Sequence, residues 1–352
     1  MNHLDLFSGY GGFTISAQKQ GWDTVNFSEI DKYATAVLKY RFPDIKNLGD
    51  ITKIKPEDLP VVDIITGGSP CQDLSVAGKG AGLDGGRSGL FFCFINLIKE
   101  KQPMYFVWEN VKGALSSSKG WDFARVQIEM EQAGYDVFWQ VINAKDFGVP
   151  QNRERIFAIG IRKGNGREIL FEQIGSSQDT KTQQQVSSTI HAGYYKQGGR
   201  DQQYVKKIVD TGHEGTNIFS TDGIAPTQKA LGGGQGAKTG LYAVGSFGKK
   251  DGFVEKEESP TISSTYYKGV QHNQGEPAVA IPNSKEGMRI RRLTPVECER
   301  LMGLPDGWTS KGIIDGKEVD ISDTQRYKMC GNGVVVNCVE YVYSLISKLT
   351  TK

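Results

Sequence analysis

The stretch that most restricts what this chain can fold into spans residues 61–71. A short apolar and β-branched run, Val61–Ile65, is followed directly by TGGSPC at residues 66–71. Such a run, ended by glycines, is typical of a buried strand in a parallel sheet. Ligand crevices in open α/β sheets lie beyond the carboxyl ends of the strands. We therefore expect Cys71 to lie on a loop at the mouth of a crevice.

Cys71 has two interpretations. Pro70 fixes its own φ and pushes Ser69 towards extended geometry, so the thiol is held in a defined direction. A glycine-rich loop follows at residues 72–89, and a long loop of this kind beside a nucleophile can act as a lid. Cys71 is then a candidate nucleophile. The alternative is a small buried residue, the usual fate of a free cysteine.

Composition excludes several classes of protein. The chain has 352 residues, 38% apolar and 23% charged, which suits a globular fold of one large domain or about two. Its formal net charge is +2, so any contact with nucleic acid depends on local basic patches. The five cysteines and His191, His213 and His272 lack the spacing of a zinc site or a disulfide framework, so we expect a reduced, cytosolic protein without a metal. No apolar run reaches membrane length and no signal peptide is evident, so no membrane partner is expected.

A glycine turn follows the first expected strand. The strand His3–Phe7 leads into SGYGGF at residues 8–13 and then into a helical pattern that continues to Lys19. A strand, a glycine-rich turn and a helix N-terminus together make a site for a nucleotide-like ligand. The spacing is not that of the dinucleotide fingerprint, because Thr14 stands where its last glycine would be. A plain structural turn is therefore the alternative.

Acidic residues follow the next two expected strands. Glu29 ends the strand Thr24–Ser28, where a carboxylate suits the two hydroxyls of a ribose. Asp50 and Ile51 follow a strand around Ile45–Leu48 and could hydrogen-bond to an adenine and pack against it. The alternative is that Glu29 and Asp31 simply begin the helix Asp31–Arg41, where acids favour the helix dipole, and both roles can hold together. Taken together, the three strand ends predict a cofactor that carries an adenosine.

Two later strands supply charged residues. The strand Met104–Trp108 ends in Glu109, so neighbouring strands deliver Cys71 and a carboxylate to one edge. Apolar surroundings raise the pKa of a carboxyl group, which suits a proton donor, although Glu109 could instead cap the following turn. Arg153 and Arg155 begin another strand and project to the same side. They could bind a carbonyl oxygen or a phosphate, or form a solvated edge.

The composition shifts to Gly, Gln, Ser, Thr and Lys between about Gly164 and Pro282. A loose internal repeat of three units pairs turns with β-prone stretches. The units are 188–190 followed by 193–196, 225–227 followed by 240–244, and 259–262 followed by 266–269. Tyrosine and lysine in glycine loops are typical of surfaces that contact phosphates and bases. A linker or a disordered insert is the alternative.

Order returns near the C-terminus. Met288–Leu293 precedes a helix that opens with the capping box Thr294–Glu297 and with proline at its first position. A glycine turn is expected across Met329–Val336 and leads into a final amphipathic helix, Asn337–Leu349. That turn resembles a second cofactor-facing loop, contributed from the far end of the chain.

Taken in order, these motifs resemble the DNA cytosine-5 methyltransferase family over nearly the whole chain outside about 165–285. The motifs are DLFSGYGG at 5–12, GGSPCQ at 67–72, ENV at 109–111, QNRER at 151–155, RLTP at 292–295 with Glu297-Cys298, and GNGV at 331–334. The resemblance implies an α/β fold, a doubly wound and mostly parallel sheet of the Rossmann-like methyltransferase type. It further implies a smaller, variable, β-rich target-recognition domain. The expected division is 1–164 for catalysis and cofactor binding, 165–322 for target recognition, and 323–352 returning to the catalytic domain.

The resemblance implies S-adenosylmethionine as the cofactor. The residues expected to bind it are Phe7, Gly9, Tyr10, Gly11, Gly12, Glu29, Ile30, Asp50, Ile51, Pro70, Leu90, Asn332 and Val334. Two positions depart from the family pattern: Ser69 stands where proline is common, and Gly333 where alanine is frequent.

The implied reaction is methylation of carbon 5 of a cytosine that is flipped out of duplex DNA. Cys71 adds to carbon 6 while Glu109 protonates the ring at N3. Arg153 holds the cytosine O2, and Arg155 orients the catalytic group. The implied setting is the cytoplasm of a bacterium or a phage-infected host, in restriction-modification or phage self-protection. No obligatory protein partner is evident, and a cognate restriction endonuclease is possible.

Three other functions stay open at this point. A tRNA cytosine-5 methyltransferase would use the same chemistry, although the long variable segment favours DNA. A nicotinamide-dependent oxidoreductase fits the glycine turn and Glu29, but it has no use for Cys71 beside Glu109. A catalytically silent DNA-binding regulator would not need Cys71, Glu109 and Arg153 intact.

Overall fold

The structure is a computed structural model that describes four long stretches of the chain, residues 1–70, 89–117, 121–164 and 287–350. Shorter described pieces lie at 169, 171, 207–209, 218–219, 243–248, 252–256, 259–262, 266 and 276–283. Cys71 and all of the expected lid except Gly89 lie outside the described residues. The first unit of the internal repeat also lies outside them.

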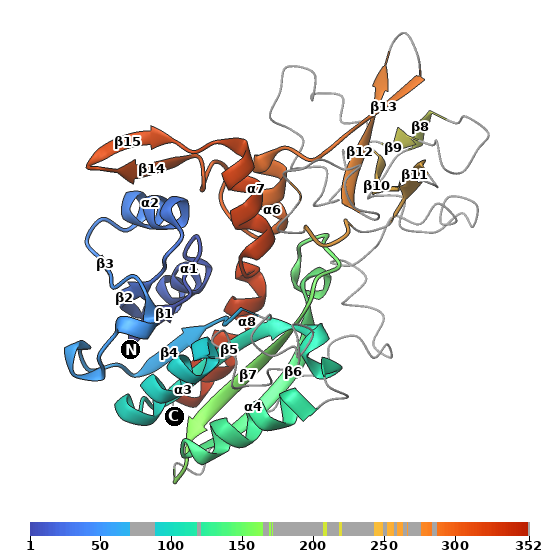
Figure 1. Ribbon diagram of the computed structural model, residues 1–352. Coiled ribbons are helices and arrows are strands. Elements are labelled where there is room, and N and C mark those ends of the chain that lie inside the picture. The colour runs from blue at the N-terminus through green and yellow to red at the C-terminus, as the bar shows by residue number, and fades with distance from the viewer. Residues whose placement is uncertain are drawn as a thin grey trace.

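The described part of the chain is organised around a seven-stranded sheet with the order β3-β2-β1-β4-β5-β7-β6 (Figure 1). Strand β7 runs antiparallel to both of its neighbours, and the other paired strands are parallel. The expected mostly parallel, doubly wound sheet is therefore confirmed. The strands are β1 (Asn2–Leu6), β2 (Asp23–Ser28), β3 (Lys46–Asn47), β4 (Ile64–Gly67), β5 (Tyr105–Val111), β6 (Tyr135–Asn143) and β7 (Glu154–Arg162).

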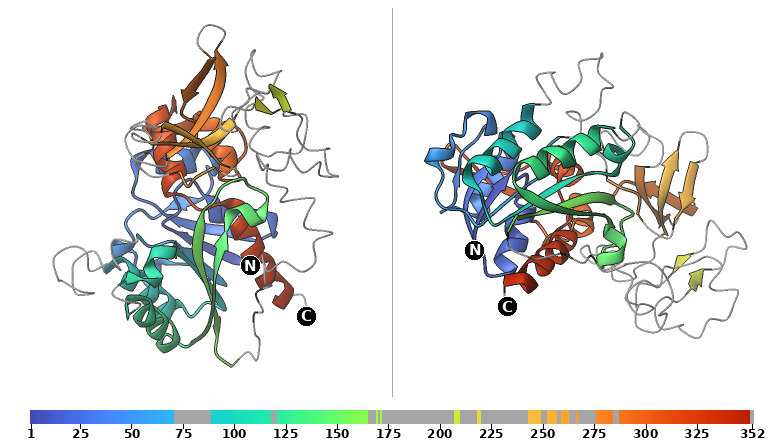
Figure 2. Two further views of the ribbon diagram at one scale, coloured as in Figure 1. Left: turned by 90° about the vertical axis from the view of Figure 1, so that its right-hand side faces the viewer. Right: turned by 90° about the horizontal axis from the view of Figure 1, so that it is seen from below.

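Helices cover both faces of this sheet (Figure 2). One hydrophobic cluster joins the sheet to α1 (Gly12–Lys19), α2 (Lys32–Arg41) and α8 (Val336–Thr350). A second cluster joins the opposite face to α3 (Gly89–Lys101) and α4 (Trp121–Gln132). Alternate residues of β5 belong to the two clusters, which explains why its sequence is an almost continuous apolar run.

The strand expected at Val61–Ile65 is wrong in its first half. Val61 is 76% exposed, and β4 begins only at Ile64. The register with β1 explains the shift, because β1 pairs with β4 from His3–Ile64 to Leu6–Gly67. The strand expected to stop before Glu109 is longer than predicted, since β7 pairs with β5 as far as Val111.

The C-terminal region adds α6 (Pro295–Leu301), the hairpin β14 (Lys311–Ile314) and β15 (Lys317–Asp320), and α7 (Asp323–Asn332). The capping box of α6 is present as expected. The glycine turn expected from Met329 is wrong, because α7 continues through Asn332. Burial of Met329 and Cys330 in the main cluster favours helix there in spite of Gly331.

The variable segment contributes short strands where it is described. A four-stranded sheet has the order β11-β10-β12-β13 and consists of β10 (Ala243–Gly248), β11 (Gly252–Glu255), β12 (Glu276–Asn283) and β13 (Gly287–Arg291). A separate pair consists of β8 (Lys207–Val209) and β9 (Ile218–Phe219). That these strands recognise DNA, and the division of the chain at 164 and 322, stay predictions.

One piece of the variable segment packs against the loop that precedes β7. The backbones of Pro150 and Asn152 exchange hydrogen bonds with Ser259, and the Thr261 hydroxyl donates to the carbonyl of Asn152. The third unit of the repeat therefore lies beside the QNRER motif. Among the described helices, none is long and apolar enough to cross a membrane.

Candidate active site

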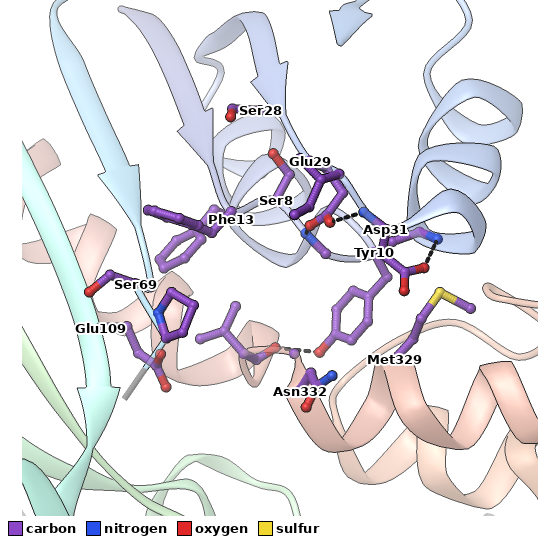
Figure 3. A pocket seen from close by; sticks show the side chains of 18 of the residues that line it. Ser8, Tyr10, Phe13, Ser28, Glu29, Asp31, Ser69, Glu109, Met329 and Asn332 are labelled. Atoms are coloured by element: carbon purple, nitrogen blue, oxygen red, sulfur yellow. Dashed lines mark hydrogen bonds between the residues drawn. The ribbon is translucent and has the colours of Figure 1, made fainter. Parts of the chain in front are cut away.

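A cavity of about 560 Å³ opens at the carboxyl ends of β1, β2, β4 and β5 (Figure 3). Its lining includes every expected site residue that the structure describes, except Gly11 and Gly12. The expected site residues that line the cavity are Phe7, Gly9, Tyr10, Glu29, Ile30, Asp50, Ile51, Pro70, Leu90, Glu109, Arg153, Arg155, Asn332 and Val334. The sequence reasoning missed Gln325, Lys328 and Met329 of α7, because that helix was not predicted.

The glycine turn after β1 is strained and tightly held. Phe7 has a φ of 55°, a left-handed conformation that costs a residue with a side chain about 1–3 kcal/mol. Gly9 and Gly11 also have positive φ, at 54° and 87°. The amide of Gly9 donates to Glu29 Oε2 over 2.8 Å, so the turn is fixed to the end of the next strand.

Glu29 and Asp31 divide the two roles that the sequence left open. Asp31 caps α2, because its carboxylate accepts from the amides of Tyr33 and Ala34. Glu29 instead lines the cavity and accepts from the amides of Gly9 and Asp31. Burial raises the pKa of Glu29, and those amide hydrogen bonds oppose the rise.

Asp50 and Ile30 line the cavity together with Glu29. They add one ionised group and one apolar group to this end of it. Asp50 Oδ1 accepts from the amide and hydroxyl of Thr52, and these hydrogen bonds hold the pKa of Asp50 below its usual value. Ile30 is 75% exposed although it is aliphatic. An exposed aliphatic side chain beside a carboxylate suits a ligand with a flat ring and polar edges.

The segment that leads to Cys71 is anchored to β5. The Ser69 hydroxyl accepts from the indole nitrogen of Trp108 over 3.1 Å. The Ser69 carbonyl accepts from the side-chain amide of Asn110, also over 3.1 Å. Serine at this position therefore supplies an acceptor for a buried indole.

Glu109 reaches the cavity from β5 and pairs with Arg155 of β7. Arg155 Nε lies 3.2 Å from Glu109 Oε1, and both side chains are largely buried. Burial raises the pKa of Glu109, whereas Arg155 and Arg153 lower it. A Cβ at Gly68 would lie 2.8 Å from Glu109 Oε2, so glycine at 68 leaves room for the carboxylate.

Arg153 joins three parts of the chain and is only 2% exposed. Its guanidinium donates to the carbonyls of Ile262, Gly331 and Gly333. Its Nε has no hydrogen-bond partner among the described residues. Burial lowers the pKa of Arg153 to about 10, which leaves it protonated at neutral pH. The contacts thus give Arg153 main-chain partners, and Arg155 is the arginine that contacts Glu109.

In the part of the chain that the structure describes, no group of three or more His, Cys, Asp or Glu side chains is arranged to hold a metal ion. The site consists of the cavity, a carboxyl group with a raised pKa, the buried Arg153 and the half-buried Arg155.

The family model, the relatives and the solved structure that resemble this chain are all methyltransferases by name. The family model "C-5 cytosine-specific DNA methylase" matches residues 1–348. The chain is 31% identical over 380 residues to the type II methyltransferase M.HhaI of Haemophilus parahaemolyticus, covering 100% of this chain and 96% of that protein. It is 29% identical over 429 residues to the orphan methyltransferase M.SPRI of Bacillus phage SPR, covering 97% and 96%. The crystal structure of S. pombe Dnmt2 methyltransferase resembles it in fold, with a TM-score of 0.64 and 16% identity over 100% of this chain and 99% of that one.

Proposed function

The chain belongs to the C-5 cytosine-specific DNA methylase family, and from this premise we propose that it methylates a cytosine flipped out of a specific duplex DNA sequence. The fold and the family imply S-adenosylmethionine as the methyl donor. The observation that carries the proposal is the Glu109–Arg155 pair, which lies in the same cavity as the glycine turn and directly beside the Ser69-Pro70 segment that leads to Cys71.

The residues present fit this cofactor. Its sulfonium supplies an activated methyl group, and its adenosine matches the end of the cavity formed by Glu29, Ile30 and Asp50. We propose that Glu29 binds the ribose hydroxyls, that Asp50 accepts from the adenine amino group, and that Ile30 and Ile51 pack on the ring. The strained turn at Phe7–Gly12 and the segments that carry Pro70, Leu90, Asn332 and Val334 would enclose the rest.

The chain's own residues would then activate the cytosine. The Cys71 thiolate adds to carbon 6, and Glu109 gives a proton to N3, so carbon 5 becomes nucleophilic and takes the methyl group. Water takes the proton from carbon 5, the bond between Cys71 Sγ and carbon 6 breaks with its electron pair returning to sulfur, and N3 returns its proton to Glu109, so that 5-methylcytosine is released. The raised pKa of Glu109 favours the protonated form that this step needs.

The geometry favours a different use of the arginines from the one the sequence predicts. Arg153 was expected to hold the cytosine O2, but its terminal nitrogens already donate to main-chain carbonyls. We therefore assign the O2 contact to Arg155, which also orients Glu109 through their ion pair. Arg153 would act at a distance, by fixing the C-terminal end of α7, which carries Asn332, and the residue that follows it.

The three alternative functions have less support than DNA cytosine methylation. The matching family model and the curated relatives concern DNA methylation, which disfavours tRNA as the substrate and a nicotinamide-dependent oxidation as the reaction. The Glu109–Arg155 pair argues against a silent regulator. As a biological role we propose protection of DNA by methylation, since the relatives include a type II enzyme and an orphan phage enzyme.

The test is covalent trapping. Duplex DNA with 5-fluorocytosine cannot lose the carbon 5 substituent as a proton, so the enzyme should stay attached to it when S-adenosylmethionine is present. We expect a mass increase that is absent in Cys71→Ala and present in Cys93→Ala, a matched cysteine variant in α3 outside the cavity lining. No adduct with DNA, with cofactor binding intact, would contradict the proposal, and an adduct with tRNA alone would change the substrate.

A further inference from the structure

Tyr10 lies between the glycines of the cofactor turn, and its ring occupies a space that two other glycines leave open. The side chain is 1% exposed. A Cβ at Gly12 would lie 2.8 Å from Val334 Cγ1 and 3.1 Å from Tyr10 Cε2. A Cβ at Gly333 would lie 2.1 Å from Tyr10 Cε1 and 2.5 Å from Cζ, closer than real atoms approach. The ring therefore fits only because residue 333 has no side chain.

The backbone at Gly333 does not itself require glycine. Its φ of −77° and ψ of 172° are open to any L-residue. The steric contact with Tyr10 is thus the reason that the structure offers for glycine at this position. The two residues are 323 positions apart in the chain. The large ring at position 10 fills the space that a side chain at position 333 would occupy.

Tyr10 is also fixed by hydrogen bonds at both of its ends. Its hydroxyl donates to the carbonyl of Val334 over 2.5 Å (Figure 3). Burial raises the pKa of Tyr10 well above its usual value, so the hydroxyl keeps its proton. Its main-chain carbonyl accepts from the indole nitrogen of Trp308 over 2.9 Å. Arg41 in turn covers the Trp308 ring and donates to the Trp308 carbonyl.

We propose that Tyr10 is a positioning residue for the cofactor, which holds the turn Gly9–Gly12 against the turn Gly333–Val334 and depends on glycine at 333 to do so. This inference rests on the proposed function. Both turns line or shape the cavity, and they come from opposite ends of the chain. A side chain that holds them together fixes the cavity walls before the cofactor arrives, which lowers the ordering cost of binding.

The test is a size-exchange experiment on cofactor affinity, measured by calorimetry with S-adenosylmethionine. We expect Gly333→Ala to weaken binding by about tenfold or more, because the methyl group displaces the Tyr10 ring. Adding Tyr10→Leu should remove the steric part of that loss and leave only the smaller weakening expected of Tyr10→Leu alone, since leucine frees the space that alanine needs but lacks the hydroxyl that contacts Val334. Tyr10→Phe keeps the ring and should weaken binding less than Tyr10→Leu alone. Gly113→Ala is the matched control, since its Cβ would meet only Val111 Cγ2 at 3.9 Å.

The steady-state readout separates positioning from general damage. Gly333→Ala should raise the KM for S-adenosylmethionine and leave the KM for duplex DNA within about twofold. If Gly333→Ala does not fold, recovery of folded protein in the double variant supports the pairing, and no recovery contradicts it. Wild-type affinity in Gly333→Ala, or additive losses in the double variant, would overturn the inference alone. Failure of the wild-type protein to bind the cofactor would contradict the proposed function and the inference with it.

Discussion

Two carboxylates at opposite ends of one cavity, Glu29 and Glu109, differ in what holds them (Figure 3). Each lies at or near the end of a sheet strand, and burial raises the pKa of each. Glu29 accepts from the main-chain amides of Gly9 and Asp31. Glu109 instead pairs with the side chain of Arg155. The two ends are thus built with different kinds of partner.

Under the proposed function, this difference would separate a group that binds the cofactor from a group that takes part in the reaction. Main-chain amides neither titrate nor change partner, so they keep Glu29 in one place and support a fixed contact with a ligand. A guanidinium can share its donors between a carboxylate and a substrate oxygen. We therefore expect substitutions at Glu109 to act on rate, and substitutions at Glu29 to act on cofactor affinity.

Glu109→Gln should give the largest effect. Glutamine keeps the size of the side chain but cannot give up a proton, so methyl transfer should slow by about 10²–10⁴-fold. Cofactor affinity should stay within about twofold, because Glu109 is not at the adenosine end. The measurement is single-turnover methylation with calorimetry in parallel. Glu154→Gln, an exposed neighbour paired with Lys112, is the matched control and should keep its rate. A Glu109→Gln variant as fast as the control would exclude Glu109 as the proton donor.

A third buried carboxyl, Asp5, extends the comparison to stability. Asp5 accepts from Thr14, its Oδ1 has no partner in the described region, and burial raises its pKa from 3.8 to about 7. Because the folded pKa is the higher one, the protonated form stabilises the fold below about pH 4, and this stability is lost as the pH rises to about 7. The loss is at most about 4 kcal/mol. Asp5→Asn should lack it.

The measurement for Asp5 is urea unfolding of both proteins between pH 4 and pH 8. The free energy of unfolding of Asp5→Asn minus that of the wild type should increase up to about pH 7 and then level off. His3, whose pKa burial lowers to about 3, contributes the opposite trend in both proteins and so cancels in the difference. A difference that does not vary with pH would mean that Asp5 is ionised in the fold.

Arg155→Met should move the pH profile of the rate. Arg155 lowers the pKa of Glu109, so its removal raises that pKa further. Since the proposed active form is the protonated carboxyl, the rate should fall as the pH rises through this pKa, and in Arg155→Met the fall should move to higher pH. The maximal rate should also drop, because the O2 contact is lost. If the fall in rate occurs at the same pH in Arg155→Met as in the wild type, Glu109 does not control the decrease of the rate at high pH.

Glu29→Gln should weaken cofactor binding by about tenfold, since charged hydrogen bonds are worth about 1.5–3 kcal/mol and glutamine can keep part of the contact. The rate at saturating cofactor should stay near that of the wild type. Calorimetry and a titration of the initial rate with S-adenosylmethionine test both statements. If Glu29→Gln lowers the rate at saturating cofactor and leaves the affinity unchanged, the proposed difference between Glu29 and Glu109 is contradicted.

Local patterns in the sequence predicted the sheet and most of the cavity. Strand ends carrying glycines, Glu29, Asp50 and Glu109 are short-range signals, and the structure brings these residues together. The partners of Arg153 could not be predicted in this way. Ile262 and Gly331 are distant from Arg153 in the chain, and no local sequence pattern marks their carbonyls as its acceptors. The match between Tyr10 and Gly333 is of the same kind. The β14–β15 hairpin was missed although Asp315-Gly316 at its tip is a turn signal, with φ of 50° and 74°.

The smallest effect is expected at the rim of the adenosine end. Lys328 of α7 lies with its Nζ 3.4 Å from Asp31 Oδ2, and the side chains are 44% and 36% exposed. An exposed ion pair contributes about 0–1 kcal/mol and is screened by salt. Lys328→Ala should therefore change cofactor affinity by less than about threefold, and the change should shrink at high salt. Lys19→Ala, which breaks the pair with Glu340 between α1 and α8, is the matched control and should leave affinity unchanged. A tenfold loss in Lys328→Ala alone would mean that α7 contacts the cofactor directly, and that the adenosine end relies on side chains as well as on the main-chain donors around Glu29.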